Sequence, residues 1–300
     1  MTKKTTRAKL TMGPLFFNWD EDKRRDFYAR IADEAAIDCV YVGEVVCGKR
    51  EKLMKDLFPQ IVERLQRGGK DVVVSTLAMV TSERQRESIE RRVQEGFTVE
   101  ANDVACLHVV QNKPHVIGPF INVFNESARD FVIRGGAKRI VMPIELPGTA
   151  IATLAKTKKA ETEVFVFGRQ PLSVAMRCYH ARAHGLRKDS CQIVCSQDPD
   201  GLATDTLDGK PLLTVSGSQT LSHDYGVLLN ELDALKKMGV SHFRLSPQNV
   251  DMIDVAKIYR DALDGKLDPK EALAKLKKVT GTIPFANGFF HSKEGMAFVT

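Results

Sequence analysis

Cysteine is the residue type in this chain with the most specific chemistry, and four of its six cysteines form a set by position. Cys178, Cys191 and Cys195 stand close together, and Cys47 stands far upstream in the segment VGEVVCGKR, residues 42–50. Thiolates bind metals through both charge and covalency, so four of them can hold an iron–sulfur cube or a zinc ion. A metal centre is therefore the leading hypothesis, and the spacing C-x12-C-x3-C is not one of the standard zinc patterns.

Ordinary buried cysteines are the alternative, because a free cysteine packs like a small apolar residue. This alternative fits Cys39 and Cys106, which stand in short apolar runs. It fits the other four poorly, since residues 177–192 are polar, carry a positive charge and show no core periodicity. We therefore expect Cys39 and Cys106 to be packing residues.

Length and composition predict an ordinary globular protein. With 300 residues and 43% hydrophobic side chains, the chain can build one large core, and we predict a single barrel-like domain over residues 1–300. The formal net charge of +6 is spread along the chain and favours anionic partners only weakly. No apolar run suggests a membrane span or a signal peptide, so we expect a cytoplasmic location, where reducing conditions keep thiolates available to metals.

Short β-branched runs alternate with helical patterns along the chain, which is typical of βα units and a parallel sheet. Strands are predicted at residues 10–12, 39–42, 72–75, 97–100, 115–117, 139–142, 163–167, 212–216 and 242–245. Helices are predicted at residues 22–34, 51–67, 82–95, 126–134, 148–156, 226–237 and 251–263. The spacing favours an α/β, TIM-barrel-like (β/α)8 fold.

Two segments stand apart from this repeat. Residues 168–210 carry the three clustered cysteines and little periodicity, which predicts a loop-rich, cluster-binding excursion from the barrel. Residues 268–280 begin with Asp268 as an N-cap and Pro269 in the first turn, which predicts a C-terminal helix packed on the barrel.

The strand-to-helix loops of a parallel barrel meet at one face, and that face carries the active site. Cys47 follows the second predicted strand, and the excursion leaves from the strand at 163–167, so both cysteine groups should reach this face. Glu145 and Arg244 are the candidate catalytic residues, because a charge beside an apolar strand is costly unless it is paired or used. A structural ion pair, even between these two, is the alternative. Other polar residues expected at this face are Asn18, Glu44, Asn102, Asp103, Asn122, Asn125, Arg169, Ser246 and Gln248.

Other metal and cofactor signals are weak. His180 and His184 would share a helix face, but without a neighbouring glutamate in the H-E-x-x-H arrangement we interpret them as surface residues. No Gly-rich phosphate loop follows a strand, so a nucleotide cofactor has no support. Of the two possible metal centres, a 4Fe-4S cluster is favoured over structural zinc. The fourth cysteine is distant in the sequence, whereas the ligands of structural zinc usually come as close pairs.

Six segments closely resemble the collagenase-like peptidase family, and specifically its members that serve ubiquinone synthesis without oxygen. They read GPLFFNW (13–19), YVGEVVCGKR (41–50), STLAMV (75–80), MPIEL (142–146), AMRCYHAR (175–182) and FRLSPQ (243–248). The resemblance implies a TIM-barrel-like protein that binds one 4Fe-4S cluster through Cys47, Cys178, Cys191 and Cys195. It also implies a heterodimer with a homologous subunit, a quinone precursor as substrate, and prephenate as the oxygen donor. An acidic donor would suit Arg244 or Arg169.

Three activities are compatible with the resemblance. The first is a subunit of an oxygen-independent ring hydroxylase. The second is hydroxylation of an RNA base, for which Arg84, Arg86, Arg91 and Arg92 are a candidate patch, although interleaved glutamates favour a solvated helix face and nucleic acid is not the expected partner. The third is a non-catalytic electron-transfer or structural partner. Peptidase activity is not expected, because the His-Gly-Ala-like stretch of the peptidase-type relatives is absent before Cys178.

Overall fold

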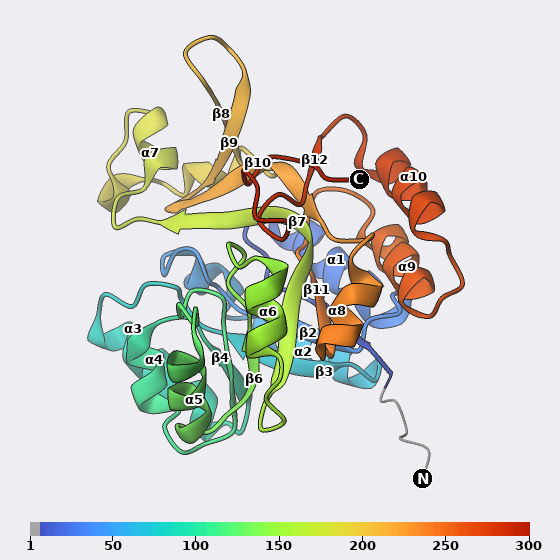
Figure 1. The fold of residues 1–300 in the computed structure, drawn as a ribbon. Helices are drawn as coiled ribbons and strands as arrows, with labels where there is room; N and C mark the ends of the chain where they lie inside the picture. The colour runs from blue at the N-terminus through green and yellow to red at the C-terminus, as the bar shows by residue number, and fades with distance from the viewer. Residues whose placement is uncertain (1–6) are drawn as a thin grey trace.

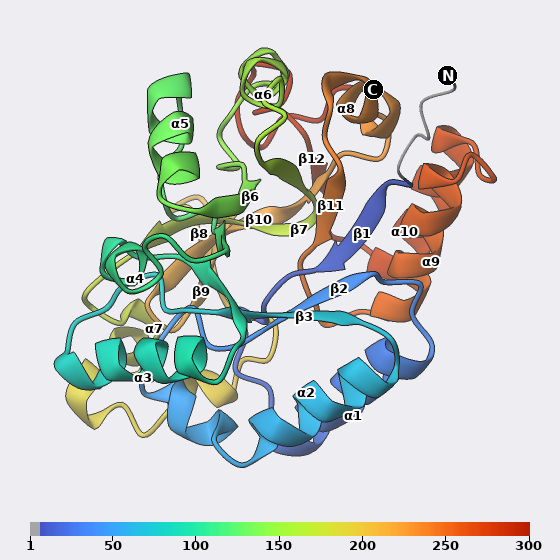
Figure 2. The ribbon, with the colours of Figure 1, turned by 90° about the horizontal axis from the view of Figure 1, so that it is seen from below.

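Eight parallel strands close into a barrel, so the predicted TIM-barrel-like fold is confirmed (Figures 1 and 2). The structure is a computed structural model that describes residues 7–300; residues 1–6 of the predicted domain lie outside the described part. The barrel closes because the last strand pairs with both the first and the seventh. Its strands are β1 (Lys9–Met12), β2 (Cys39–Val42), β3 (Asp71–Ser75), β4 (Thr98–Ala101), β5 (His115–Ile117), β6 (Ala137–Val141), β7 (Glu161–Val174) and β11 (His242–Leu245).

Helices surround the barrel, as Figure 2 shows. Several begin at an acidic or amide cap: Asp20 accepts from the backbone N–H of Lys23 in α1, and Asn125 does the same for α5. None of the described helices is both long enough and apolar enough to cross a membrane. The helices around the barrel are α1 (Glu21–Asp33), the 3-10 turn η1 (Arg50–Met54), α2 (Leu57–Arg67), α3 (Glu83–Gln94), α4 (Val104–Val109), α5 (Glu126–Arg134), α6 (Gly148–Leu154), α8 (Leu232–Met238), α9 (Met252–Leu263) and α10 (Pro269–Thr280).

The largest core lies between the strands and this layer of helices. Alternate strand residues such as Val40 and Val42 face outward and pack against apolar helix side chains such as Ile61 and Leu65. Burying such side chains stabilises the fold by roughly 1.5–3 kcal/mol each. The residues between them face the barrel interior, which is where polar groups gather.

A second sheet extends from the barrel, because β7 continues for 14 residues and pairs beyond the barrel with β10 (Gln219–Val227) (Figure 1). β9 (Pro211–Ser216) and β8 (Leu202–Asp205) continue this sheet in antiparallel order, and the short β12 (Phe285–Ala286) pairs with β10. At the junction Gly168 has φ +117°, and an added Cβ would lie 2.8 Å from the Gln248 side chain. Only glycine lets β7 pass this point at so close an approach.

One predicted strand lies outside the barrel, and one predicted helix has different bounds. The predicted strand at 212–216 is confirmed as β9, but it belongs to the second sheet, where its pairing is antiparallel. The predicted helix at 226–237 begins only at Leu232, since Gly226 and Val227 still belong to β10 and residues 228–231 form a turn. The three clustered cysteines lie between β7 and β8, among the short helices α7 (Tyr179–Ala183), η2 (Lys188–Ser190) and η3 (Val194–Ser196).

Candidate metal centre and the groove beside it

The four predicted ligand cysteines line a single small cavity, although Cys47 comes from a different segment than the other three. The cavity lies between the loop after β2 and the segment from α7 to η3 and measures about 340 Å³ including its open mouth. Cys178 and Cys195 are buried, and Cys47 and Cys191 are half-buried. The structure therefore brings the whole set together at the carboxyl end of the barrel strands.

The loop that carries Cys47 is held from inside by a buried carboxylate. Glu44 Oε1 accepts backbone N–H groups from Val46 at 2.8 Å and from Cys47 at 2.9 Å. Burial raises the pKa of Glu44, while Arg50 and the two N–H groups act in the opposite direction. Ser218 donates to the carbonyl of Val46 at 2.7 Å, which fastens this loop to the second sheet.

Arg50 joins the same loop to the rest of the molecule. Its side chain is 1% exposed and donates to the carbonyl of Phe16 at 3.0 Å and to Ser216 Oγ at 3.3 Å. Its Nη1 also lies 4.0 Å from Glu44 Oε1. A buried guanidinium beside the cysteine cavity stabilises negative charge on the sulfurs.

The other wall of the cavity is shaped by local backbone geometry. Cys178 caps α7, with its sulfur accepting from the N–H of Ala181 at 3.4 Å. Gln192 and Ile193, between the last two cysteines, have φ values of 48° and 57°. A β-branched residue in this left-handed region is an outlier that persists only where the surroundings require it. This turn aims Cys191 and Cys195 at the same cavity.

The spacing of the sulfurs bears on which metal centre they can hold. Ligands of one tetrahedral zinc ion at Zn–S distances near 2.3 Å lie about 3.8 Å apart. Throughout residues 7–300, no three of these cysteine sulfurs lie within 4.8 Å of one another. A 4Fe-4S cube needs wider spacing, because each sulfur binds a different iron. This spacing does not match one tetrahedral zinc ion, and four cysteines are a donor set that a 4Fe-4S cube can use.

Positive groups surround this donor set. Lys49 donates to the backbone carbonyls of Lys188 and Asp189 and lies 4.0 Å from the sulfur of Cys191. Lys49, Arg50 and Lys188 all line the cavity. Three cations around four thiolates offset the negative charge that a thiolate-ligated cluster carries.

Cys39 and Cys106 lie elsewhere, each in its own apolar cluster. Burial raises the pKa of both thiols to about 12, so they remain neutral at physiological pH. Their surroundings suit packing residues.

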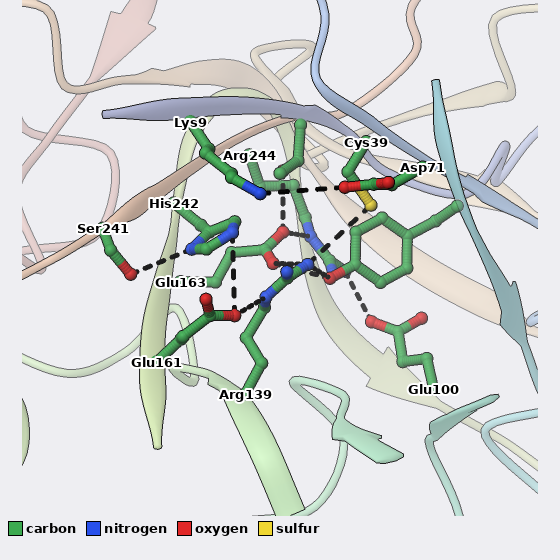
Figure 3. Close-up of polar contacts among 12 residues, drawn as sticks. Lys9, Cys39, Asp71, Glu100, Arg139, Glu161, Glu163, Ser241, His242 and Arg244 are labelled. Atoms are coloured by element: carbon green, nitrogen blue, oxygen red, sulfur yellow. Dashed lines mark hydrogen bonds and ion pairs between the residues drawn. The ribbon is translucent and has the colours of Figure 1, made fainter. Parts of the chain in front are cut away.

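The second predicted site residue, Arg244, lies inside the barrel in a network of charged groups (Figure 3). Its Nε donates to Glu163 Oε1 at 2.7 Å, and its Nη1 forms an ion pair of 2.8 Å with Glu100 Oε1. The guanidinium also lies 4.0 Å from the centre of the Tyr41 ring. Burial opposes ionisation of Glu163, but Arg244 and Arg139 outweigh it and lower the pKa of Glu163 to about 2.

Glu145 is exposed in the loop after β6, and it forms no ion pair with Arg244 among the described residues. Arg244 therefore pairs with Glu163 and Glu100 rather than with Glu145, and neither carboxylate was among the predicted site residues. Arg169 is likewise held internally, donating to the backbone carbonyls of Ser222 and His223.

The remaining polar residues of this face mostly fix the local backbone. Asp103 and Asn125 cap helices, and Gln248 contacts Ser246. Asn18 accepts a hydrogen bond from Arg24, and Asn102 donates one to Glu100. Asn122 is exposed.

His242, at the amino end of β11 in the charged network, leads to a prediction about how the stability of the fold depends on pH. Burial lowers the pKa of His242 from 6.5 to about 4, against the attraction of Glu163 and Glu161, while Arg139 and Lys9 lower it further. The folded state therefore keeps the ring neutral where the unfolded chain takes up a proton. We expect the free energy of unfolding to fall by on the order of 2 kcal/mol as the pH drops from about 6.5 to about 4. Urea unfolding at stepped pH measures it.

His242→Gln, which cannot titrate, should show a shallower decline over this window. His108→Gln is the matched control, because His108 is exposed on α4. Equal pH slopes for His242→Gln and the unchanged chain would rule out His242 as the cause.

A broad basic groove lies beside the cysteine cavity, between the loop after β2, η1, α2 and α3. It encloses about 1570 Å³ including its open mouth, and Lys49 lines both the groove and the cavity. Its basic residues are Lys49, Lys52, Lys55, Arg84, Arg91 and Arg92. Arg84, Arg91 and Arg92, which the sequence pattern assigned to a solvated helix face, thus line a concave surface. Arg86 instead pairs with Glu83 and Glu90.

One acidic residue of this groove escaped sequence reasoning. Burial and the neighbouring Glu44 raise the pKa of Glu51 to about 7, although Arg84 and Arg92 act against this. A carboxyl group that is half ionised near neutral pH can both give and take a proton. The sequence signal that could have identified Glu51 is its position directly after the Cys47 segment, residues 42–50.

Comparison with known families now adds to this geometry. The family model described as Peptidase family U32 matches residues 27–298, which is most of the chain. The chain belongs to peptidase family U32. The U32 match covers the barrel strands from β2 onward and all four cysteines of the cavity.

Among solved structures, this U32 chain is similar to the spore coat polysaccharide biosynthesis protein SpsE of Bacillus subtilis. The two are 11% identical with a TM-score of 0.47, and the match covers 99% of this chain and 76% of that one. A likeness this distant carries no information about function.

Proposed function

We propose that this chain is the iron–sulfur subunit of an oxygen-independent hydroxylation system in anaerobic ubiquinone synthesis. In this role it would resemble UbiV and act with a homologous, UbiU-like subunit. The observation that carries the proposal is the cavity in which Cys47 meets Cys178, Cys191 and Cys195 beside a basic groove.

In the proposed centre the four cysteines hold a 4Fe-4S cluster. A cluster with four protein ligands supplies one-electron transfer. The residues of the chain set its surroundings: Glu44 holds the Cys47 loop, and Lys49 and Arg50 stabilise the negative charge. Burial of Cys178 and Cys195 limits the access of bulk water to one side of the centre.

The basic groove is the proposed binding site of an acidic oxygen donor such as prephenate. Lys52 and Arg91 line it, are exposed and have no ion-pair partner among the described residues, so their charges are available to a carboxylate. Arg244 and Arg169 are less suitable than the groove, because internal acceptors already occupy them. Glu51 is the proposed proton donor or acceptor in the groove.

Exposed apolar side chains favour the cysteine-bearing side as the docking surface of the partner subunit. Met176 and Tyr179 are 60% and 51% exposed next to Cys178, and Leu207 at the β8–β9 turn is fully exposed. Large exposed apolar residues that serve no packing role are typical of interaction surfaces.

Proteolysis is not proposed. The one serine–histidine contact among the described side-chain hydrogen bonds joins Ser241 to His242 at 2.9 Å, with Glu161 3.8 Å beyond (Figure 3). It lies at the amino ends of the barrel strands, where residues serve stability rather than catalysis. His242 is also 1% exposed, so a peptide could not reach it.

Anaerobic reconstitution with the partner, a quinone precursor and prephenate tests the proposed function. The double variant Lys52→Glu/Arg91→Glu should raise the KM for prephenate at least about tenfold, a loss of roughly 1.4 kcal/mol, with cluster content unchanged. Lys257→Glu/Lys278→Glu reverses two exposed charges on α9 and α10 and is the matched control. An unaltered KM would exclude the groove, and no hydroxylated product from the unchanged pair would exclude the function.

RNA-base hydroxylation is the second candidate, because the same groove would suit a phosphate backbone. RNA binding that weakens steeply with salt would favour it. Absence of binding at low salt would remove this candidate.

A further inference from the structure

His180, His184 and Asp198 form a cluster of metal-ligating groups in the cysteine-bearing segment, apart from the cysteine cavity. Their ligand atoms all lie within 4.8 Å of one another, and no other set of three or more histidine, cysteine or acidic residues in the described chain does so. The interpretation of both histidines as surface residues was wrong for His180, which is fully buried, because α7 turns it toward β9. His184 is exposed, and Asp198 is half-buried.

The three groups converge on one oxygen atom. Asp198 Oδ2 lies 2.7 Å from His180 Nε2 and 3.7 Å from His184 Nε2. The two rings are parallel within 8°, with their centres 5.5 Å apart. Nitrogen and oxygen ligands about 2.0 Å from a tetrahedral ion lie about 3.3 Å from each other, a value between these two distances.

The hydrogen bonds of His180 give a second, independent argument. Its Nδ1 lies 3.3 Å from the carbonyl oxygen of Val215, and its Nε2 faces Asp198. A neutral imidazole has one N–H and one lone pair, so it cannot donate to both oxygens. A histidine that donates one N–H to a backbone carbonyl and offers its other nitrogen to an ion is the usual arrangement in metal sites.

We propose that His180, His184 and Asp198 bind one divalent transition-metal ion, zinc or ferrous iron. Two imidazoles and a carboxylate suit either ion, and the exposed side of His184 leaves a coordination position open to water. The site needs no participation of the four cysteines.

The place of the site in the chain gives the ion a structural role, and this role rests on the proposed cluster. His180 follows Cys178 by two residues, and Asp198 follows Cys195 by three. The turn after Asp198 is fastened to the barrel, since Trp19 Nε1 donates to the carbonyl of Pro199 at 2.8 Å. An ion here ties the first and last clustered cysteines to each other and to the barrel.

Metal analysis of the anaerobically purified full chain, followed by zinc titration, tests the site. We expect one zinc or ferrous ion per chain beyond the cluster iron. His184→Ala should weaken zinc binding at least about 100-fold, since it removes a direct ligand from an exposed position without opening the core. His108→Ala is the matched control and should bind as the unchanged chain does.

Asp198→Asn keeps the size of the side chain and should weaken zinc in the same way. Equal zinc binding by the unchanged chain, His184→Ala and Asp198→Asn would overturn the site. Repeating the titration with Cys47→Ala separates the two proposals, because loss of the cluster with an intact His184-dependent ion supports an independent site. If removing the ion with a chelator leaves the lifetime of the cluster unchanged, the structural role is overturned.

Discussion

Replacing Cys47 by alanine is expected to abolish the iron–sulfur cluster, although this residue is far from the other three ligands in the sequence. The substitution takes away one of four thiolates in the shared cavity, and a cube with an unligated iron is readily lost. Iron and acid-labile sulfide in the anaerobically purified chain, together with its visible absorbance, measure the effect. Both contents should fall from about four per chain to near zero.

Cys39→Ala is the matched control, because Cys39 is 1% exposed in the barrel interior and outside the cavity. It should keep full cluster content even if stability falls by about 1 kcal/mol. A chain that loses its cluster with Cys39→Ala and keeps it with Cys47→Ala would contradict the ligand assignment. Zinc in place of iron and sulfide would show that the centre is a different one.

The barrel was predictable because its determinants are local. Short runs rich in β-branched residues, such as 39–42 and 115–117, coincide with β2 and β5, since such runs between helical segments specify parallel strands without knowledge of their neighbours. The meeting of Cys47 with the clustered cysteines followed from topology, because both segments leave the carboxyl ends of barrel strands.

The second sheet was less accessible to sequence reasoning. β10 alternates polar and apolar residues, but it ends at Gly226-Val227, where a helical pattern was assumed to begin. Its stability comes from pairing with β7, which is 45 or more residues away in the chain. Pairing over such a distance leaves no local signal.

The side-chain partners of the candidate site could not be predicted either. A charge within an apolar strand signals a partner without naming it, and Arg244 takes Glu163 from β7 and Glu100 from β4. Likewise, the arginines of α3 line a groove only because η1, with Lys52 and the flanking Lys49 and Lys55, lies opposite. Both arrangements depend on barrel register rather than on spacing along the chain.

Removing the carboxylate of Glu163 should produce the largest loss of stability of any single substitution considered for this chain. Glu163 is fully buried, and its oxygens accept from Arg244 at 2.7 Å, Thr11 at 2.7 Å and Tyr41 at 2.6 Å. Glu163→Ala leaves the buried Arg244 and the half-buried Arg139 without this counter-charge, so we expect the free energy of unfolding to fall by about 3–5 kcal/mol in urea titrations. Glu63→Ala, which removes an exposed partner of Arg67, should cost less than about 1 kcal/mol.

The double variant Glu163→Leu/Arg244→Met separates a structural from a catalytic role for Arg244. Replacing both buried charges with apolar residues of similar size removes the unpaired charge, so much of the stability lost in Glu163→Ala should return. Glu100 keeps hydrogen bonds from Ser75 at 2.6 Å and Asn102 at 3.1 Å in this variant. If the stable double variant retains its cluster and hydroxylates the quinone precursor with its partner, Arg244 serves the barrel alone. If cluster and fold persist while product formation stops, the guanidinium contributes to the reaction from inside the barrel.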